Sequence, residues 1–327
     1  MAEPTRIAEG IWAIATRTPV PGLPFTLCYV LVSPRGDLHV IDPGWAGIGS
    51  YEQLSRSFEN IGLRIHDVRT VLATHFHRDH LGLSAELRER TGARLLLSTV
   101  ECDVIARSEA GEPSTLQARE AQWETWGVPQ DRRDDLTVPT EQKDDDRPVH
   151  ADGTVDDGEI LPFEGHSLEV VATPGHTQGH LCLADRDRQV VYTGDHVLPQ
   201  IFSGIGIGSL PGHDPVHDFL TSLEKLSAFD AFDVLPGHEY GFTKLGKRRR
   251  QIAYHHVRRA REVSELLGEL GSASIWQYAR RVSWTRGWAA LRGYALESAL
   301  RQTALHREFV ESGNATEWFE RYPTARP

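Results

Sequence analysis

The sequence predicts an α/β fold over residues 1–247, followed by a smaller, mainly helical C-terminal domain over residues 248–327. Two observations lead to this prediction. Up to about residue 245, short apolar segments rich in β-branched residues alternate with segments of helical apolar spacing, which is typical of sheets covered by helices. Beyond that point the chain has helical spacing interrupted by glycine turns.

The first hundred residues contain apolar segments that read as five strands, at 7–16, 26–32, 38–41, 68–73 and 93–98. Helices are expected over residues 50–62, which are amphipathic, and over residues 79–91, which stop at Gly92. Glycine is common just after the end of a helix.

Strand signals return in the second half of the chain, at 159–163, 167–173, 180–185, 189–193 and 232–235. A helix at about 215–228 follows the glycine-rich loop 203–208. Between the halves, residues 108–150 are polar and acidic and carry Trp123 and Trp126. They read either as a solvated excursion or as a tryptophan-bearing helix at 114–126 that forms a lid over a site.

The composition points to an ordinary globular protein, with 39% hydrophobic and 25% charged residues. No apolar stretch approaches the roughly 20 residues of a bilayer span, and the N-terminus does not resemble a secretory signal. We therefore expect a cytoplasmic protein without a membrane partner. The net charge of −11 makes indiscriminate nucleic-acid binding unlikely as a function. The sequence leaves a homodimer open.

The strongest chemical signal is Thr74-His75-Phe76-His77-Arg78-Asp79-His80, in which four metal-competent side chains lie within six residues. They follow a predicted strand and lead into a predicted helix. Imidazole suits zinc and similar metals, and a carboxylate can complete the ligand set.

Three more motifs follow predicted strands and place further ligand types in turns. They are TPGHTQGH with His176, TGDH with Asp195 and LPGHEY with His238. Loops at one end of a sheet are where catalytic groups are commonly displayed. Five histidines and two aspartates suffice for two metals that share a solvent molecule.

The histidines near these motifs have less definite roles. His180 reads equally as a support for the ligands or as a packed residue, and His196 is expected to be structural. His255 and His256 are expected on a helix surface. Tyr240 is a candidate donor to substrate or oxyanion, with a core position as the alternative.

In this order, the motifs resemble those of the metallo-β-lactamase-fold hydrolase superfamily, over roughly residues 1–245. The resemblance implies a four-layer αββα sandwich with a dinuclear site at one edge of its two sheets. It implies that His75, His77 and His176 hold the first metal, that Asp79, His80 and His238 hold the second, and that Asp195 bridges them. Asp42 of VIDPG would support these ligands. Two Zn²⁺ ions are expected, with iron or manganese as alternatives.

Within the superfamily, Asp195 argues against a true β-lactamase, and His77 argues against a diiron flavoprotein. The PGHEY ending resembles hydroxyacylglutathione hydrolases (glyoxalase II), but the following GFTKLGKRRRQIAYHHVRRARE does not resemble their glutathione-binding tail. The C-terminal segment is similar to that of the lactamase-β-2-like hydrolases, in which a small winged-helix-like domain follows the lactamase fold. A helical cap packed on the sandwich is the alternative.

Two functions are compatible with this site. The first is hydrolysis of a small acyl thioester, ester or lactone by a metal-bridging hydroxide, with Asp79 and Tyr240 as candidate catalytic residues. The C-terminal domain and residues 108–150 would then shape the acyl pocket. The second is cleavage of RNA, in which a basic group would hold phosphate: Arg248, Arg249, Arg250, Arg258 and Arg259. The acidic net charge favours the small molecule.

Overall fold

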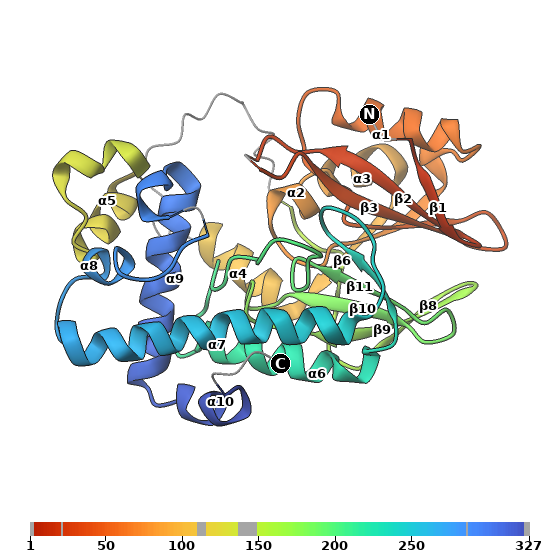
Figure 1. Cartoon of the computed structure of the whole chain (residues 1–327). Helices are drawn as coiled ribbons and strands as arrows, with labels where there is room; N and C mark the ends of the chain where they lie inside the picture. Colours follow the sequence, from red (N-terminus) through yellow and green to blue (C-terminus); the bar gives the residue numbers. More distant parts are fainter. Residues whose placement is uncertain (1–2, 21, 110–115, 137–148, 286, 324–327) are drawn as a thin grey trace.

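The computed structural model describes residues 3–20, 22–109, 116–136, 149–285 and 287–323. Two β-sheets lie face to face with helices on their outer sides (Figure 1). Much of the expected polar excursion, at 110–115 and 137–148, lies outside the described residues.

The first sheet has seven strands in sequential order, the first four antiparallel and the remainder parallel. They are β1 (Thr5–Ala8), β2 (Ile11–Arg17), β3 (Phe25–Val32), β4 (Leu38–Ile41), β5 (Val68–Leu72), β6 (Arg94–Ser98) and β7 (Gly153–Val155). The predicted strand at 7–16 is thus divided into β1 and β2, and β7 was not predicted.

The second sheet has five strands in the order β12-β11-β10-β9-β8. They are β8 (Ile160–Phe163), β9 (His166–Ala172), β10 (Leu181–Asp185), β11 (Val190–Gly194) and β12 (Asp233–Pro236). The pairs from β8 to β11 are antiparallel, and β11 runs parallel to β12. Consequently β9, β11 and β12 end at the same edge of the sheet.

Alternating side chains of β10 show how one strand serves two cores. Leu181 and Leu183 face the first sheet and join the core between the sheets. Cys182 and Ala184 point the other way, into the core beneath the outer helices. This period of two, with both faces apolar, is what a strand covered on both sides requires.

Helices cover the outer face of each sheet. On the first sheet they are α1 (Ser50–Asn60), α2 (Arg78–Leu81), α3 (Ser84–Thr91) and α4 (Thr99–Glu109), and on the second α6 (Pro215–Lys225) and α7 (Leu245–Leu270). In α1, the apolar spacing of Tyr51, Leu54 and Phe58 turns one face into the core. The result is the predicted four-layer αββα sandwich.

The C-terminal region is helical, with α8 (Ile275–Ala279), α9 (Gly293–Glu311) and α10 (Ala315–Arg321). No strand forms among the described residues after Pro236. Short 3₁₀ helices complete the fold: η1 (Ile65–Asp67), η2 (Gln130–Arg132), η3 (Asp134–Leu136), η4 (Leu226–Phe229) and η5 (Trp288–Ala290).

Helix α5 (Leu116–Thr125), which lies in the expected polar excursion, packs on these C-terminal helices. Trp123 and Trp126 are buried in one cluster with Trp276 of α8 and Leu296 of α9. The described part of the excursion is therefore anchored by its two tryptophans in an apolar core, while most of its other side chains are exposed.

Helix α7 connects the sandwich to the C-terminal helices and passes through the expected domain boundary at 247/248. Near its start, Leu245 and Ile252 pack in the core of the second sheet. Near its end, Val263 packs with Tyr278 of α8. Figure 1 shows α7 lying along the second sheet and extending beyond it toward α9. Among the described helices, none has the length and apolarity of a membrane span.

Candidate metal centre

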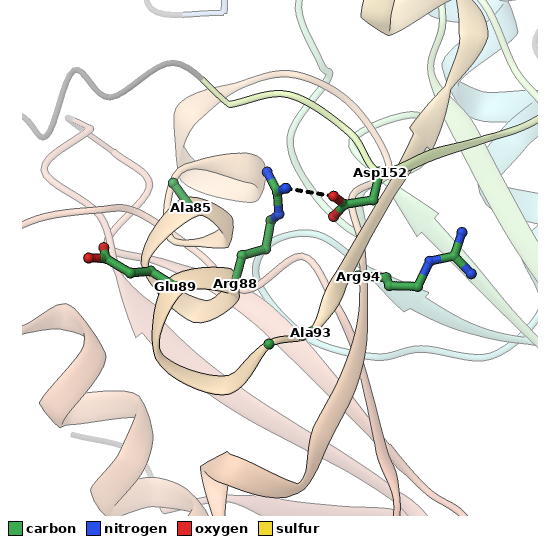
Figure 2. Close-up of a pocket in the computed structure, with 7 residues that line it drawn as sticks. Ala85, Arg88, Glu89, Ala93, Arg94 and Asp152 are labelled. Carbon is green, nitrogen blue, oxygen red and sulfur yellow. Dashed lines mark hydrogen bonds and ion pairs between the residues drawn. The ribbon is translucent and has the colours of Figure 1, made fainter.

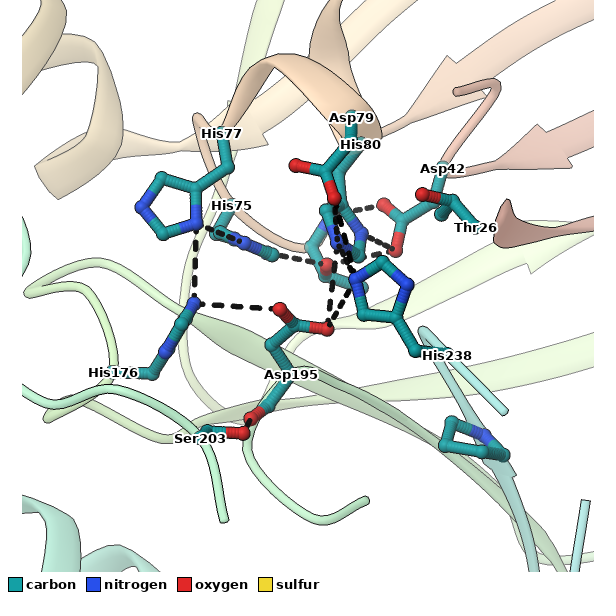
Figure 3. A network of polar contacts seen from close by, with 12 residues as sticks. Thr26, Asp42, His75, His77, Asp79, His80, His176, Asp195, Ser203 and His238 are labelled. Atoms are coloured by element: carbon teal, nitrogen blue, oxygen red, sulfur yellow. Dashed lines mark hydrogen bonds and ion pairs between the residues drawn. The ribbon is translucent and has the colours of Figure 1, made fainter. Parts of the chain in front are cut away.

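The seven predicted ligands meet where strands of both sheets end (Figure 3). The turn after β5 supplies His75 and His77, and helix α2 supplies Asp79 and His80. The turns after β9, β11 and β12 supply His176, Asp195 and His238. Because β9, β11 and β12 run in one direction, their ends present these side chains at a single edge. The sheets are joined there by a hydrogen bond from Leu181 N to Thr74 O.

The first group of ligand atoms comprises His75, His77, His176 and Asp195. His77 Nδ1 lies 2.9 Å from His75 Nε2 and 3.2 Å from His176 Nε2. His176 Nε2 is also 3.6 Å from Asp195 Oδ2. Three imidazoles and a carboxylate thus direct their nitrogens and one oxygen to a common point, as Figure 3 shows.

The second group comprises Asp79, His80 and His238. His238 Nε2 lies 3.3 Å from both His80 Nε2 and Asp79 Oδ2. Asp195 reaches this group with its other oxygen, because Oδ1 is 3.3 Å from His238 Nε2 and 3.4 Å from His80 Nε2. The two oxygens of Asp195 therefore face different groups, which is the geometry of a bridging carboxylate.

Hydrogen bonds on the outer ring nitrogens orient the histidines. The Nδ1 atoms of His176 and His238 lie 2.7 Å and 2.8 Å from the carbonyl oxygens of Gly204 and Phe25. A carbonyl only accepts, so each Nδ1 carries the hydrogen and each Nε2 presents a lone pair to the centre. Such outer contacts fix the tautomer of a metal-binding histidine.

Asp42 ties the turn after β5 to the end of β4. Its carboxylate accepts hydrogen bonds from Thr74 N at 2.7 Å and Thr74 Oγ1 at 2.8 Å, and it lies 2.8 Å from His80 Nδ1. Thr74 Oγ1 is in turn 3.0 Å from His75 Nδ1. One buried carboxylate thus positions a histidine of each group.

The glycines of the two Pro-Gly-His motifs are required sterically. A Cβ on Gly237 would lie 2.6 Å from His80 Cε1 and 2.7 Å from Asp195 Oδ1. Gly175 has a φ of 132°, and a Cβ there would lie 2.5 Å from the Cα of Phe219. The motif therefore lets the backbone approach the centre and the helix behind it more closely than any side chain permits.

Charge within the centre matches bound cations. Burial lowers the pKa of His77 to about 3, so this imidazole is neutral and able to bind a metal. Burial also opposes the charge of His238, but Asp195 and Asp79 outweigh burial and raise its pKa to about 10. Without a cation at the centre His238 therefore carries the positive charge itself, and a bound metal would take the place of the proton on Nε2. Asp195 Oδ1 is buried and has no hydrogen-bond donor among the described residues. Buried carboxylates in this number need positive charge nearby, and the donor set fits zinc, iron or manganese.

Tyr240, the other predicted catalytic residue, lies outside both groups. Its side chain is half exposed, and its hydroxyl is 2.8 Å from Gln200 Nε2. It follows His238 by two positions but contacts the loop after β11.

The remaining histidines divide into supporting and packed residues. His180 is buried and its Nε2 accepts a hydrogen bond of 3.2 Å from Asp195 N, so it supports the bridging aspartate. His196 is buried against Phe219. His256 is also fully buried, so the expectation of a surface position was wrong: it lies on the apolar face of α7 beside His306.

Glu101 was not anticipated from the sequence. It lies in α4, fully buried, and its Oε1 accepts a hydrogen bond from Thr177, the residue after His176. Burial raises the pKa of this carboxyl to about 7, although the Thr177 hydroxyl acts in the opposite direction. A glutamate on a helix usually faces solvent, so nothing local in the sequence marks it.

A cavity of about 560 Å³ opens onto the centre. Four of the predicted ligands line it, namely His77, Asp79, His176 and Asp195. Six aliphatic side chains form a further part of its wall: Val20, Leu23, Leu198, Ile201, Ile205 and Ile207. Helices α5 and α9 close one side with Arg119, Tyr294, Glu297, Ser298 and Arg301. The C-terminal region therefore contributes directly to the space beside the ligands.

Another cavity, of about 580 Å³, lies between α3 and β6 and has no part in this centre (Figure 2). Arg88 and Asp152 form an ion pair of 2.6 Å at its wall, and Arg88 also donates to the carbonyl of His150. These contacts connect α3 to the chain entering β7. We assign them a structural role.

Comparisons with known proteins bear on the family and the fold of the chain. The family model of the Metallo-beta-lactamase superfamily matches residues 21–238. A solved structure, a metallo-beta-lactamase family protein from Thermus thermophilus, has a TM-score of 0.76 at 24% identity, covering 94% of this chain and 95% of that one. At that identity the likeness shows the fold.

Sequence relatives include hydrolases. Hydroxyacylglutathione hydrolase GloC of Haemophilus influenzae is 27% identical over 226 residues, covering 68% of this chain and 89% of that protein. Acyl-coenzyme A thioesterase MBLAC2 of Gallus gallus is 27% identical over 197 residues, 58% of this chain and 62% of that protein. The match to Beta-lactamase-like protein 2 homolog of Caenorhabditis elegans, at 29% identity, spans about half of that relative, 48%.

The family model covers the strands and turns that carry all seven predicted ligands, and the neighbouring structure reproduces the sandwich. The superfamily and the two groups of ligand types together imply a dinuclear metal site. The resemblance seen in the sequence motifs is thereby confirmed, and the chain belongs to the metallo-beta-lactamase superfamily.

Proposed function

We propose that this chain is a dinuclear metal-dependent hydrolase that acts on small acyl thioesters. The observation that carries the proposal is the largely apolar cavity of about 560 Å³, which opens onto ligands of both groups. A pocket of this size and lining suits an acyl chain whose carbonyl lies at the metals. Esters and lactones are the alternative substrates of the same site.

In this proposal His75, His77 and His176 hold one metal, Asp79, His80 and His238 hold the other, and Asp195 bridges them. Two metals bound there would bring the pKa of a shared water near 7 and stabilise negative charge on a carbonyl oxygen. Asp79 lines the cavity. In this proposal it would also orient the attacking water toward the substrate. The remaining cavity wall holds the acyl group in position.

The ionisable side chains of the cavity favour a thioester. Outside the ligand groups, the lining offers one carboxylate, Glu297, which is 2.6 Å from Arg119 and 3.7 Å from Arg301. Held between two cations, Glu297 is poorly suited to protonate a leaving group. A thiolate leaves without a dedicated acid, so a thioester makes the smallest demand on this site. The thioesterase name of one relative supports the same choice.

The RNA-cleaving alternative depended on the basic stretch of α7. In the structure Arg248 is buried and donates to the backbone carbonyls of Leu198, Gln200 and Ile201. Arg249 is buried and pairs with Asp230. Arg250 also pairs with Asp230, Arg258 pairs with Glu262, and Arg259 donates to the carbonyl of Ser283. All five arginines thus have partners within the chain, which favours the small-molecule substrate.

The test is a substrate panel offered to the metal-loaded protein. Thiol release from acyl thioesters of increasing chain length is compared with hydrolysis of matched esters and lactones and of a single-stranded RNA. We expect thioester turnover to exceed the others and to depend little on salt. RNA cleavage that declines steeply with salt, with no thiol release, would support the alternative.

A further inference from the structure

A separate cavity of about 500 Å³ lies on the other side of Phe202 from the metal centre. Phe202 lines both cavities. Arg248 holds residues 198–202 in place, because it donates to the carbonyls of Leu198 and Ile201 and stacks over the Phe202 ring at 4.7 Å. The two cavities therefore adjoin at Phe202.

The lining of this cavity is cationic and aromatic. It contains three arginines and no carboxylate among the described residues: Phe202, Arg248, Gln251, Tyr254, His255, Arg258, Arg259, Ser283, Trp284 and Thr285. His255 stacks flat on Phe202, with ring centroids 3.9 Å apart. Burial, and then the neighbouring charge of Arg259, lower the pKa of His255 to about 3, so the positive charge belongs to the arginines.

Arg259 is the most informative of these residues. It is only 5% exposed on α7, lies over the Trp284 ring at 3.9 Å and donates to the carbonyl of Ser283 at 3.1 Å. Its Nε is buried with no acceptor, and it forms no ion pair within the described part of the chain. The charge of Glu262 acts on Arg259 without an ion pair, and this carboxylate already pairs with Arg258 and accepts a hydrogen bond from Ser283 N. A buried guanidinium with so little compensation is costly, and an anionic ligand would lower that cost.

Arg258 adds a second, more exposed cation. Its side chain is 47% exposed, and its nearest carboxylate, Glu262, is 3.7 Å away. Several guanidinium groups with little opposing charge match a multiply charged phosphate better than a single carboxylate.

Resting on the proposed thioester hydrolysis, we infer that this cavity binds a phosphate group carried by the thiol half of the substrate. The acyl chain occupies the aliphatic cavity beside the metals, and the thiol half passes Phe202. Its phosphate then meets Arg258 and Arg259, and its ring system stacks on the aromatic lining. The site thus selects a phosphate-bearing thiol over a short uncharged one.

The test compares two thioesters with the same acyl group. One carries coenzyme A, which bears phosphates, and the other carries pantetheine, which bears none. For the wild-type holoenzyme we expect kcat/KM to be at least about tenfold higher with coenzyme A, mainly through KM. Arg258→Ala should reduce this ratio by about tenfold, and Arg259→Lys should reduce it as well. Arg250→Ala, which removes an exposed arginine of α7 outside the cavity, should leave the ratio unchanged.

Equal kcat/KM for the two thioesters in the wild type would overturn the inference and leave the proposed function standing. Absence of any thioester turnover would overturn the proposed function instead. In that case calorimetry with adenosine 3′,5′-bisphosphate tests whether the cavity binds a phosphate-bearing ligand. Binding that is lost in Arg258→Ala and kept in Arg250→Ala supports an anion site, and no binding by the wild type rejects it.

Discussion

Asp42 Oδ2 lies 2.8 Å from His80 Nδ1, and both side chains are buried. Asp42 belongs to neither ligand group. Its carboxylate instead holds the imidazole of His80, which belongs to the second group. Removing such an outer partner of a metal-binding histidine commonly lowers metal affinity by about 10- to 100-fold. We therefore expect Asp42→Ala to weaken metal binding by that factor, as measured by competition with a chromophoric chelator.

Asp37→Ala is the matched control, because Asp37 is an exposed residue whose partner is Arg69. It should bind metal like the wild type. Unchanged affinity in a folded Asp42→Ala protein would show that Asp42 does not position His80.

The two groups of ligands predict a stoichiometry. If each group holds one metal, His77→Ala and Asp79→Ala should each retain about one metal per chain after dialysis, whereas the wild type retains two. Elemental analysis of the dialysed proteins measures this directly. Two metals in either variant would mean that the substituted side chain is not a ligand.

The aliphatic cavity predicts a limit on acyl length. Ile207 lines it and is partly exposed, so Ile207→Trp should fill part of the cavity without disturbing the core. The tryptophan ring would exclude long acyl chains from the cavity more than short ones. We therefore expect the ratio of kcat/KM for long-chain thioesters to kcat/KM for short-chain thioesters to fall by at least about tenfold. Ile160→Trp, on the exposed edge of the second sheet, is the control. An unaltered length preference in Ile207→Trp would place the acyl chain elsewhere.

Glu101 predicts a pH dependence of stability. Its pKa is about 7 in the folded protein, against an ordinary value of 4.5, because burial disfavours the carboxylate. The native state therefore holds the proton more tightly than the unfolded chain. The stability that the neutral carboxyl contributes is full below about pH 4.5 and is lost as the pH rises through 7.

Glu101→Gln removes this dependence. Relative to the variant, the holoenzyme should lose up to about 3 kcal/mol of unfolding free energy between pH 4.5 and 8, as followed by urea unfolding. Glu124→Gln, at an exposed position of α5, should track the wild type. Parallel curves for wild type and Glu101→Gln would mean that Glu101 is ionised at little cost.

The sequence was most informative where chemistry is local. His75, His77, Asp79 and His80 lie within six residues, and each other ligand lies in a turn after a strand, so their types and spacing sufficed to predict a metal site. The division into two groups came from the resemblance to the superfamily. The glycines before His176 and His238 belong to the same local pattern, because the close approach that they permit is needed wherever the motif forms.

Features that depend on distant contacts were not predictable in this way. Strand β7 is three residues long and exists through its pairing with β6. Trp123 is buried because it packs against Trp276 and Leu296, which are distant from it in the sequence. His256 and Glu101 are polar residues on helices, and their burial is decided by packing partners that no local pattern reveals.

The most direct measurement is thiol release by metal-loaded wild type, Asp195→Ala and Asp233→Ala, with metal content determined on the same samples. Asp195 faces both ligand groups with its two oxygens, whereas Asp233 is an exposed aspartate at the start of β12. We expect Asp195→Ala to lose turnover by about a thousandfold or more while remaining folded, and Asp233→Ala to match the wild type. Near-normal thiol release by a fully metal-loaded Asp195→Ala protein would contradict a bridged dinuclear centre.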